Sequence, residues 1–347
     1  MMCHPTQFEA ARTESGYDFR PCFEDIQPYT SNADLTLANL ETTLAGKEMT
    51  YSGYPSFNTP EQFALAIKES LGVDVLSTAN NHSLDRNFSG LVRTLSFLDQ
   101  YGLKHTGTYA NQEDSKKILF VNIKGIKIAF LSYTYGTNGV SLPSGKTYAV
   151  NYISKEKMRS DAQRARDTGA NLIIASIHWG QEYANQPSSE QQSLARWLFE
   201  NTDINIIAGN HVHAVQPIEF LHVKDRDTGL QKEGLVIYAQ GNFVSDQQTI
   251  GANKGIIVNI TLGITPQKHR CDIQLVQYIP CWVDETPGAG LKTYRALNIE
   301  KALKDFRANK DSLLSRSDYD EMLDFSFGVK KIIPPSERIQ YADSFTN

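Results

Sequence analysis

Short apolar runs that end abruptly in polar residues recur along the first two thirds of the chain. Residues 73–76 form such a run and predict a buried strand, because the run is short and β-rich. Asn80, Asn81 and His82 follow this strand directly, before a helical pattern that stops at Gly102. In α/β folds chemistry collects at the carboxyl ends of strands, so these three residues mark a candidate site.

Three other predicted strands, one from an alternating pattern (34–38) and two from apolar runs, also end in polar residues. They cover residues 34–38, 171–177 and 204–208, and the polar residues that follow them are Asn39 with Glu41, His178, and His211 with His213. If the strands are neighbours, these side chains converge on one edge of a sheet.

Helix signals separate the predicted strands. Thr59 and Ser188 each open a capping-box pattern, and Pro60 stands at the first helical position after Thr59. Residues 154–168 show a polar-faced helix that ends before Gly169. The alternation of strand and helix up to about residue 208 indicates an α/β domain.

After residue 208 the pattern predicts mainly strands. From residue 215 to residue 279 most segments read as strands, and a hairpin is already predicted earlier, at residues 118–123 and 126–132. From residue 298 the tail is charged and helical in pattern. We therefore expect one α/β domain with a second β layer, covering residues 1–297, and a helical extension, residues 298–347, packed on the same domain.

Composition narrows the class of protein. The 347 residues are 40% hydrophobic and carry a net charge of −5, which is typical of a globular protein and gives no basic footprint for nucleic acid. No apolar run approaches the roughly 18 residues of a membrane span, and no signal peptide is visible at the start. The four cysteines match no zinc or redox motif, so we expect free or buried thiols.

Imidazole, carboxylate and amide groups together are suited to Mn, Zn, Fe or Mg. Two histidines separated by one residue, as in His211 and His213, can point at two adjacent metal ions that Glu41 bridges, and a two-metal site suits phosphoryl transfer. Each cluster can also be explained without a functional site. His178 can be a hydrogen-bonded structural residue, and Asn80 with Asn81 can form a turn. The combination favours a site more strongly than any cluster alone.

The ordered motifs resemble the calcineurin-like metallophosphoesterase superfamily. The order is Asn-x-Glu, Asn-His-x-x-Asp, His-Trp-Gly, Gly-Asn-His-x-His and Gln-Gly-Asn-Phe, within roughly residues 1–262. More closely the chain resembles the bacterial CapA/PgsA-like capsule-synthesis family, which is linked to poly-γ-glutamate. This resemblance implies a two-sheet β-sandwich flanked by helices, in four αββα layers, with the site at the strand ends.

The resemblance also implies roles for individual residues. Glu41 bridges two divalent ions (Mn, Zn, Fe or Mg), Asn81, His178 and His211 complete one ion, and His213 belongs to the other. His82 is the general acid or charge stabiliser, and Asp85 orients its ring. We further predict that Asn39, Trp179 and Asn242 contact the substrate; a plain β-turn is the alternative for Asn242.

The chain departs from the family pattern at its start. The family begins with a strand that ends in Gly-Asp, and that Asp is a ligand of the first ion; no residue precedes Met1 here. Either the true protein is longer at its start, or this copy has lost a ligand; in both cases one ion site is incomplete as given. We favour a truncated start, because loss of the edge of a buried sheet should cost stability, and the missing part would also hold any export signal or anchor. We expect the sequenced part to be soluble, and the complete protein to act at the cell envelope or outside the cell. His4 can approach the site but is not placed like a family ligand.

Two functions remain open at this point. The first is a metal-dependent phosphoester hydrolase in capsule or polyglutamate biosynthesis, with His82 assisting the leaving group. The second is a non-catalytic module of the same fold that binds an anionic polymer or a capsule-synthesis membrane protein. The partners expected are therefore a phosphoester or anionic polymer, and not nucleic acid.

Overall fold

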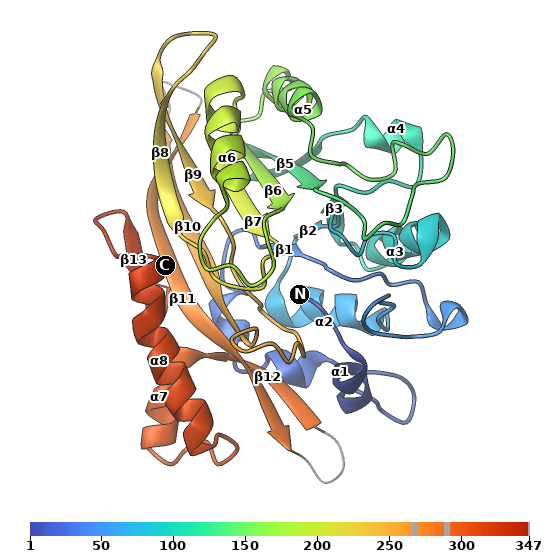
Figure 1. The fold of residues 1–347 in the computed structure, drawn as a ribbon, viewed down its shortest axis with the longest axis vertical. Helices are drawn as coiled ribbons and strands as arrows, with labels where there is room; N and C mark the ends of the chain where they lie inside the picture. Colours follow the sequence, from blue (N-terminus) through green and yellow to red (C-terminus); the bar gives the residue numbers. More distant parts are fainter. Residues whose placement is uncertain (266–269, 288–291, 346–347) are drawn as a thin grey trace.

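A six-stranded sheet is the centre of the molecule (Figure 1). The computed structural model describes residues 1–265, 270–287 and 292–345. The strand order is β4-β5-β6-β7-β9-β8, in which β5, β6, β7 and β9 run parallel and the outer strands β4 and β8 run antiparallel. The strands are β4 (Leu119–Ile123), β5 (Ile126–Thr134), β6 (Leu172–His178), β7 (Ile206–Asn210), β8 (Ile218–Lys224) and β9 (Gln231–Ile237).

A second layer packs against this sheet. It consists of a three-stranded parallel sheet, β1-β2-β3, and a four-stranded sheet in which β10, β11 and β12 are antiparallel and β13 pairs in parallel with β11. The strands are β1 (Leu37–Asn39), β2 (Val75–Ser77), β3 (Lys104–Thr106), β10 (Lys254–Thr265), β11 (Arg270–Pro287), β12 (Lys292–Asn298) and β13 (Ile339–Tyr341).

One apolar core joins the two layers. Val75 of β2 and Ile256 of β10 are buried in the same cluster as Phe130 of β5 and Ile206 of β7. The three-stranded and four-stranded sheets also share a second core on their other face, which includes Leu76 and Cys281. The two smaller sheets therefore act as one layer, and burial of both of its faces holds it in place.

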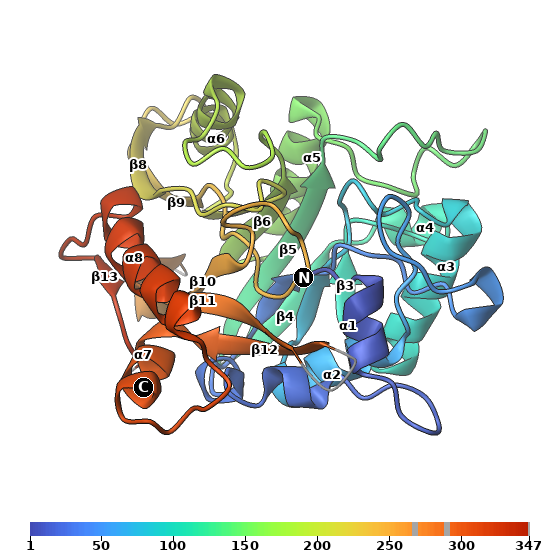
Figure 2. The same cartoon turned by 60° about the horizontal axis from the view of Figure 1, so that its bottom comes forward.

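Helices cover both outer faces (Figures 1 and 2). Helices α5 (Lys155–Asp167) and α6 (Ser189–Asn201) pack on the six-stranded sheet, while α7 (Ile299–Arg307) and α8 (Arg316–Ile332) pack on β11. The other helices are α1 (Pro5–Ala10), α2 (Gln62–Leu71), α3 (Asn87–Gln100), the short α4 (Gln112–Ser115) and three 3₁₀ turns, Arg20–Phe23, Gln27–Tyr29 and Lys47–Met49. The predicted α/β sandwich flanked by helices is confirmed.

The second layer differs from the prediction in two details. It consists of two separate sheets, and the tail after residue 297 contributes the strand β13 in addition to its helices. At the start of the described chain, Met1 N donates to Asn39 O of β1 at 2.9 Å, and Met2 N donates to Val244 O, in the segment before β10, at 3.0 Å. The division at residue 297 remains a prediction.

The two predicted capping boxes have different outcomes. Ser188 caps α6 as predicted, because its hydroxyl accepts from Gln191 N and the Gln191 side chain accepts from Ser188 N. The Thr59 capping box is wrong: α2 begins after Glu61 without a side-chain cap. The Thr59 hydroxyl lies 2.8 Å from the Thr42 hydroxyl, so a tertiary hydrogen bond replaces the local one.

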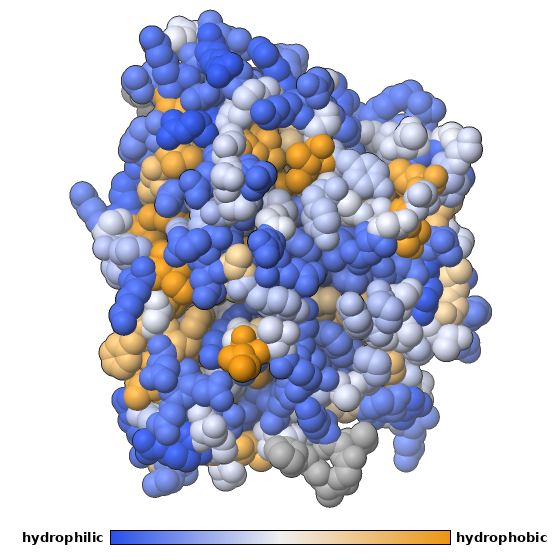
Figure 3. All heavy atoms as spheres, in the orientation of Figure 1, coloured by the Kyte–Doolittle hydropathy of each residue, from blue (hydrophilic) through white to orange (hydrophobic). Residues whose placement is uncertain are grey.

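The surface and the cysteines agree with the composition. All four cysteines are free thiols. On the face in Figure 3, apolar side chains are scattered among hydrophilic ones, as on ordinary globular proteins. Among the described residues, no helix combines the length and the apolar character that crossing a membrane requires.

Two glycines give a test of the packing. A Cβ on Gly209 would lie 1.9 Å from Tyr238 O, whereas a Cβ on Gly328, in the middle of α8, would meet nothing within 4 Å. We expect Gly209→Ala to lower the free energy of unfolding by about 3 kcal/mol through overpacking. Gly328→Ala should raise it by about 0.5–1 kcal/mol, because alanine restricts the unfolded chain. Urea denaturation measures both, and a tolerated Gly209→Ala would contradict the strand packing.

Candidate functional site

The predicted site residues stand where parallel strands end. Asn39 is the last residue of β1 and His178 is the last residue of β6, while His211 follows the last residue of β7. The loop after β2 carries Asn81 and His82. Because carboxyl ends of strands from both layers meet at this edge, residues far apart in sequence come together there.

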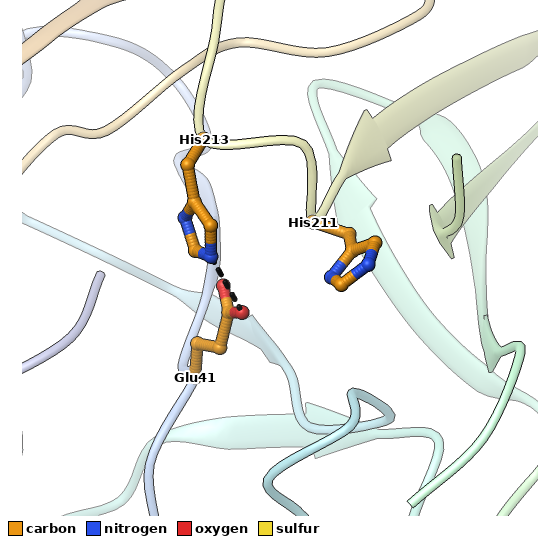
Figure 4. Close-up of side chains that lie close together, drawn as sticks. All are labelled: Glu41, His211 and His213. Carbon is orange, nitrogen blue, oxygen red and sulfur yellow. Dashed lines mark ion pairs between the residues drawn. The ribbon is translucent and has the colours of Figure 1, made fainter. Parts of the chain in front are cut away.

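Glu41, His211 and His213 form the centre of the cluster (Figure 4). One ligand atom from each of these side chains lies within 4.8 Å of the others. Glu41 Oε1 is 3.8 Å from His213 Nε2 and 3.3 Å from His178 Nε2. One carboxylate therefore faces imidazoles that come from two different strand ends.

The loop after β7 adopts an unusual backbone to present these imidazoles. His211 has φ +98° and His213 has φ +57°, in the left-handed region that side chains with a Cβ rarely adopt. Each such residue costs of order 1–3 kcal/mol and persists only where its surroundings enforce it. In this loop the two strained histidines flank Val212, which is itself fully buried.

Asn81 joins the cluster from the opposite layer. Its Oδ1 lies 2.8 Å from His178 Nε2, and its Nδ2 donates to Asn138 Oδ1 at 3.2 Å. In this arrangement the amide oxygen of Asn81 faces His178 and its amide nitrogen faces Asn138. The predicted ligand set of Glu41, Asn81, His178, His211 and His213 is thus brought to one place.

Several polar atoms in the cluster are buried without a hydrogen-bond partner, although Glu41 Oε1 lies within ion-pair distance of two imidazoles. Among the described residues, Glu41 Oε1, His178 Nδ1, His211 Nδ1 and Asn39 Oδ1 have no hydrogen-bond partner. Burying an unpaired polar atom costs free energy, and such atoms in a native protein call for an explanation. A divalent cation held by the carboxylate and the imidazoles fits these residues, because oxygen and nitrogen are its usual protein ligands.

The electrostatics also favour a cation. Burial raises the pKa of Glu41, but the adjacent His178 and His213 outweigh burial and hold this pKa well below its usual range. Burial lowers the pKa of His178, and burial together with the neighbouring His178 lowers the pKa of His211 to about 3. At neutral pH Glu41 is thus ionised and His178 and His211 are neutral, the protonation states that bind metals.

A histidine–aspartate pair lies beside the cluster. His82 Nδ1 is 2.7 Å from Asp85 Oδ2, which also accepts from the backbone N of Phe57 at 2.6 Å. Burial lowers the pKa of His82, but the hydrogen bond and charge of Asp85 outweigh burial and raise this pKa above its ordinary value. The Phe57 ring meets the imidazole edge-on with centroids 4.7 Å apart, so the ring is held on two sides.

Asn80 organises the loop that carries His82. Its Nδ2 donates to Leu40 O at 2.7 Å, and its Oδ1 accepts from His82 N at 3.0 Å. Asn80 thereby ties the loop after β2 to the residue before Glu41. Asn80 therefore stabilises the loop through bonds to the backbone, while the side chain of Asn81 faces His178.

The three predicted substrate contacts occupy different places. Asn39 Nδ2 donates to Glu41 Oε2 at 3.3 Å, within the cluster. Trp179 is buried in the core between the six-stranded sheet and its helices, where its Nε1 donates to Tyr238 O. Asn242 lies behind His213, with Oδ1 3.0 Å from His213 Nδ1. Trp179 is therefore the one predicted site residue that is not brought to the cluster.

One residue at the site, Asn138, was not predicted as a member. Asn138, at φ +49°, reaches Asn81 and lies 3.4 Å from His82 Nδ1; its only sequence signal is an Asn-Gly turn. The half-exposed rings of Tyr135 and Tyr183 border the cluster, with centroids 4.6 Å from His211 and 6.0 Å from His213. His4 is partly buried nearby, and its Nδ1 accepts from Asp246 N.

Comparison with known proteins gives the following similarities. The family "Bacterial capsule synthesis protein PGA_cap" matches residues 1–247. The chain is 28% identical over 232 residues to "Capsule biosynthesis protein CapA" of Bacillus anthracis, covering 65% of this chain and 54% of that protein. It is 27% identical over 237 residues to "PGA biosynthesis protein CapA" of Bacillus subtilis, covering 65% and 57%. The chain thus spans little more than half the length of these relatives.

Solved structures are more distant. A 5'-nucleotidase precursor from Thermus thermophilus has a TM-score of 0.41 and 16% identity, covering 71% of this chain and 44% of that one. A calcineurin-like phosphoesterase from Bacillus subtilis has a TM-score of 0.39 and 11% identity, covering 77% and 75%.

Proposed function

The chain belongs to the bacterial capsule synthesis protein PGA_cap family, and on that premise we propose that it is a divalent-metal-dependent phosphoester hydrolase. The observation that carries the proposal is the convergence of Glu41, His178, His211 and His213 at one edge, with Asn81 beside them. A buried carboxylate beside the neutral imidazoles of His178 and His211 is poorly solvated unless a cation joins it. The unpartnered buried atoms of this cluster support the same conclusion.

Glu41, Asn81, His178, His211 and His213 would hold two ions. When bound, such ions act as Lewis acids that stabilise charge on phosphoryl oxygens. The chain's own contribution is to keep these ligands deprotonated and in place. Burial keeps His178 and His211 neutral, and the contact with Asn138 holds the Asn81 side chain beside His178. The number and identity of the ions are part of the proposal.

His82 is the proposed general acid. Asp85 accepts a hydrogen bond from His82 Nδ1–H. The proton on the other ring nitrogen, Nε2, is then the one that His82 donates to the leaving oxygen. The raised pKa keeps a larger fraction of His82 protonated near neutral pH, as an acid requires. The tight contacts of Asp85 and Phe57 reduce the motion of the ring before the proton moves.

The direct test combines metal analysis with turnover. Purified protein is stripped with a chelator, titrated with Mn²⁺, Zn²⁺ or Mg²⁺, and assayed with p-nitrophenyl phosphate and bis-p-nitrophenyl phosphate. We expect the protein to bind a transition ion and to hydrolyse at least one of the esters only when the ion is present. Ion binding without turnover of either ester would overturn the proposal of a phosphoester hydrolase.

A second candidate follows from the relatives, whose names place them in capsule and PGA biosynthesis. In this alternative the same fold binds an anionic polymer or a partner of capsule assembly without catalysis. It is tested by fluorescence anisotropy with labelled poly-γ-glutamate. Polymer binding that is unchanged in His82→Ala and His211→Ala, together with no ester hydrolysis, would favour this alternative; absence of polymer binding would count against it.

A further inference from the structure

His213 differs from the two other histidines around Glu41 in how its ring is held. His178 and His211 have no hydrogen-bond partner on Nδ1 among the described residues. His213 Nδ1 instead lies 3.0 Å from Asn242 Oδ1, and both side chains are about 5% exposed. One of the three imidazoles therefore has a dedicated buried partner.

The hydrogen bonds of Asn242 fix the direction of its amide. Nδ2 donates to Ala252 O at 2.6 Å and to Gln247 Oε1 at 2.7 Å. Because a backbone carbonyl only accepts, the nitrogen of Asn242 must face Ala252 and the oxygen must face His213. An amide oxygen also only accepts, so His213 Nδ1 must carry the hydrogen.

The backbone around Asn242 is rigidly placed. Asn242 N donates to Lys254 O at 2.9 Å, and the preceding Gly241 has φ +69°. A Cβ on Gly241 would lie 2.5 Å from Lys254 O, and a Cβ on Gly255 would lie 2.4 Å from Asn242 O. Close backbone contact with the start of β10 thus leaves Asn242 little freedom to turn away from His213.

We propose that Asn242 is a positioning residue that locks His213 in the Nδ1–H tautomer and so presents the Nε2 lone pair toward Glu41. His213 Nε2 lies 3.8 Å from Glu41 Oε1, on the side of the ring opposite Asn242. Partners that hold the second nitrogen of a ligand histidine set its tautomer and raise its basicity. The proposal rests on the proposed metal site, but not on the hydrolysis of any ester.

The test uses two variants of Asn242 and one control. Asn242→Leu removes the acceptor for His213, whereas Asn242→Asp keeps an acceptor there and loses only the donors to Ala252 and Gln247. Asn201→Leu is the matched control, because Asn201 is a similarly buried amide that donates to Trp197 O in α6. Thermal denaturation of each variant reports whether it is folded.

The first readout is the tautomer of the metal-free protein. Long-range ¹H–¹⁵N NMR of ¹⁵N-histidine-labelled protein distinguishes a protonated Nδ1 from a protonated Nε2. We expect His213 as the Nδ1–H tautomer in wild type, Asn242→Asp and Asn201→Leu, and as a mixture of tautomers in Asn242→Leu. A wild-type tautomer in folded Asn242→Leu would overturn the proposal, whether or not the protein binds metal or hydrolyses an ester.

The second readout is Mn²⁺ affinity, measured by isothermal titration calorimetry. We expect Asn242→Leu to bind Mn²⁺ about tenfold or more weakly, the usual cost of losing a partner behind a metal ligand. Asn242→Asp should remain within about threefold of wild type because the Nδ1 partner is kept. An equal loss of affinity in both variants would assign the effect to the contacts of Ala252 and Gln247, and would overturn the proposal.

Discussion

Glu41→Gln should abolish metal binding while leaving the fold intact. Glu41 supplies the only carboxylate of the Glu41, His211 and His213 cluster, and its charge is the main attraction that the cluster offers a cation. Glutamine keeps the shape and removes that charge. We expect the Mn²⁺ affinity to fall further than the roughly 10–100-fold cost of losing an outer partner. Ester hydrolysis should fall about a thousandfold or more, equivalent to about 4 kcal/mol of transition-state stabilisation.

Thermal stability gives an independent measure of the same change. An ion at a hundred times its Kd stabilises the wild-type protein by about 2.7 kcal/mol, and we expect no such gain in Glu41→Gln. Asp284→Asn is the matched control: Asp284 is a carboxylate with 1% exposure that belongs to a separate ion-pair cluster with Arg295. Its replacement should change stability but not Mn²⁺ affinity. Wild-type Mn²⁺ binding by Glu41→Gln would remove Glu41 from the site.

His82→Ala should impair catalysis without impairing metal binding. Loss of a general acid costs typically about 10²–10⁴-fold in rate. The loss should be largest for alkyl phosphates, whose leaving oxygen needs a proton, and smallest for p-nitrophenyl phosphate, whose phenolate leaves readily without one. Comparison of kcat for the two substrates measures this difference. Equal losses for both substrates would assign His82 a role in charge stabilisation instead of proton transfer.

Asp85→Asn tests the partner of His82 in the same assay. We expect a smaller loss than for His82→Ala, because the imidazole stays in place while its orientation and basicity change. The control is His105→Ala: His105 forms a second histidine–aspartate pair with Asp99, 3.1 Å apart, outside the site. It should leave both substrates unaffected. An Asp85→Asn variant as active as wild type would contradict the pairing seen in the structure.

Local sequence patterns were sufficient to predict many of the helices and strands. The capping box at Ser188, the hairpin of β4 and β5, and the strands that end at His178 and Asn210 all follow from interactions within a few residues. The order of ligand-type residues after those strands indicated a shared site, because parallel strands bring their carboxyl ends to one edge. Periodicity and capping are local properties, and so they are readable from the chain alone.

Other features depend on partners far away along the chain. The Thr59 hydroxyl bonds to Thr42 and does not cap α2, and the indole of Trp179 turns into the core to reach Tyr238. Asn138 enters the site only because the fold brings it to Asn81, 57 positions earlier in the chain. No local pattern distinguishes these outcomes, since each is chosen by which distant group is close enough to bond.

The sequence by itself determined the α/β class, the second β layer, and the set of carboxylate, amide and imidazole groups that meet at the strand ends. The tertiary structure decided how those groups face one another. It placed Glu41 between His178 and His213, bent the backbone at His211 and His213 into the left-handed region, and set Asn242 behind His213. The reason is physical: residue type fixes which bonds a group can form, while burial and long-range packing fix which of those bonds it forms.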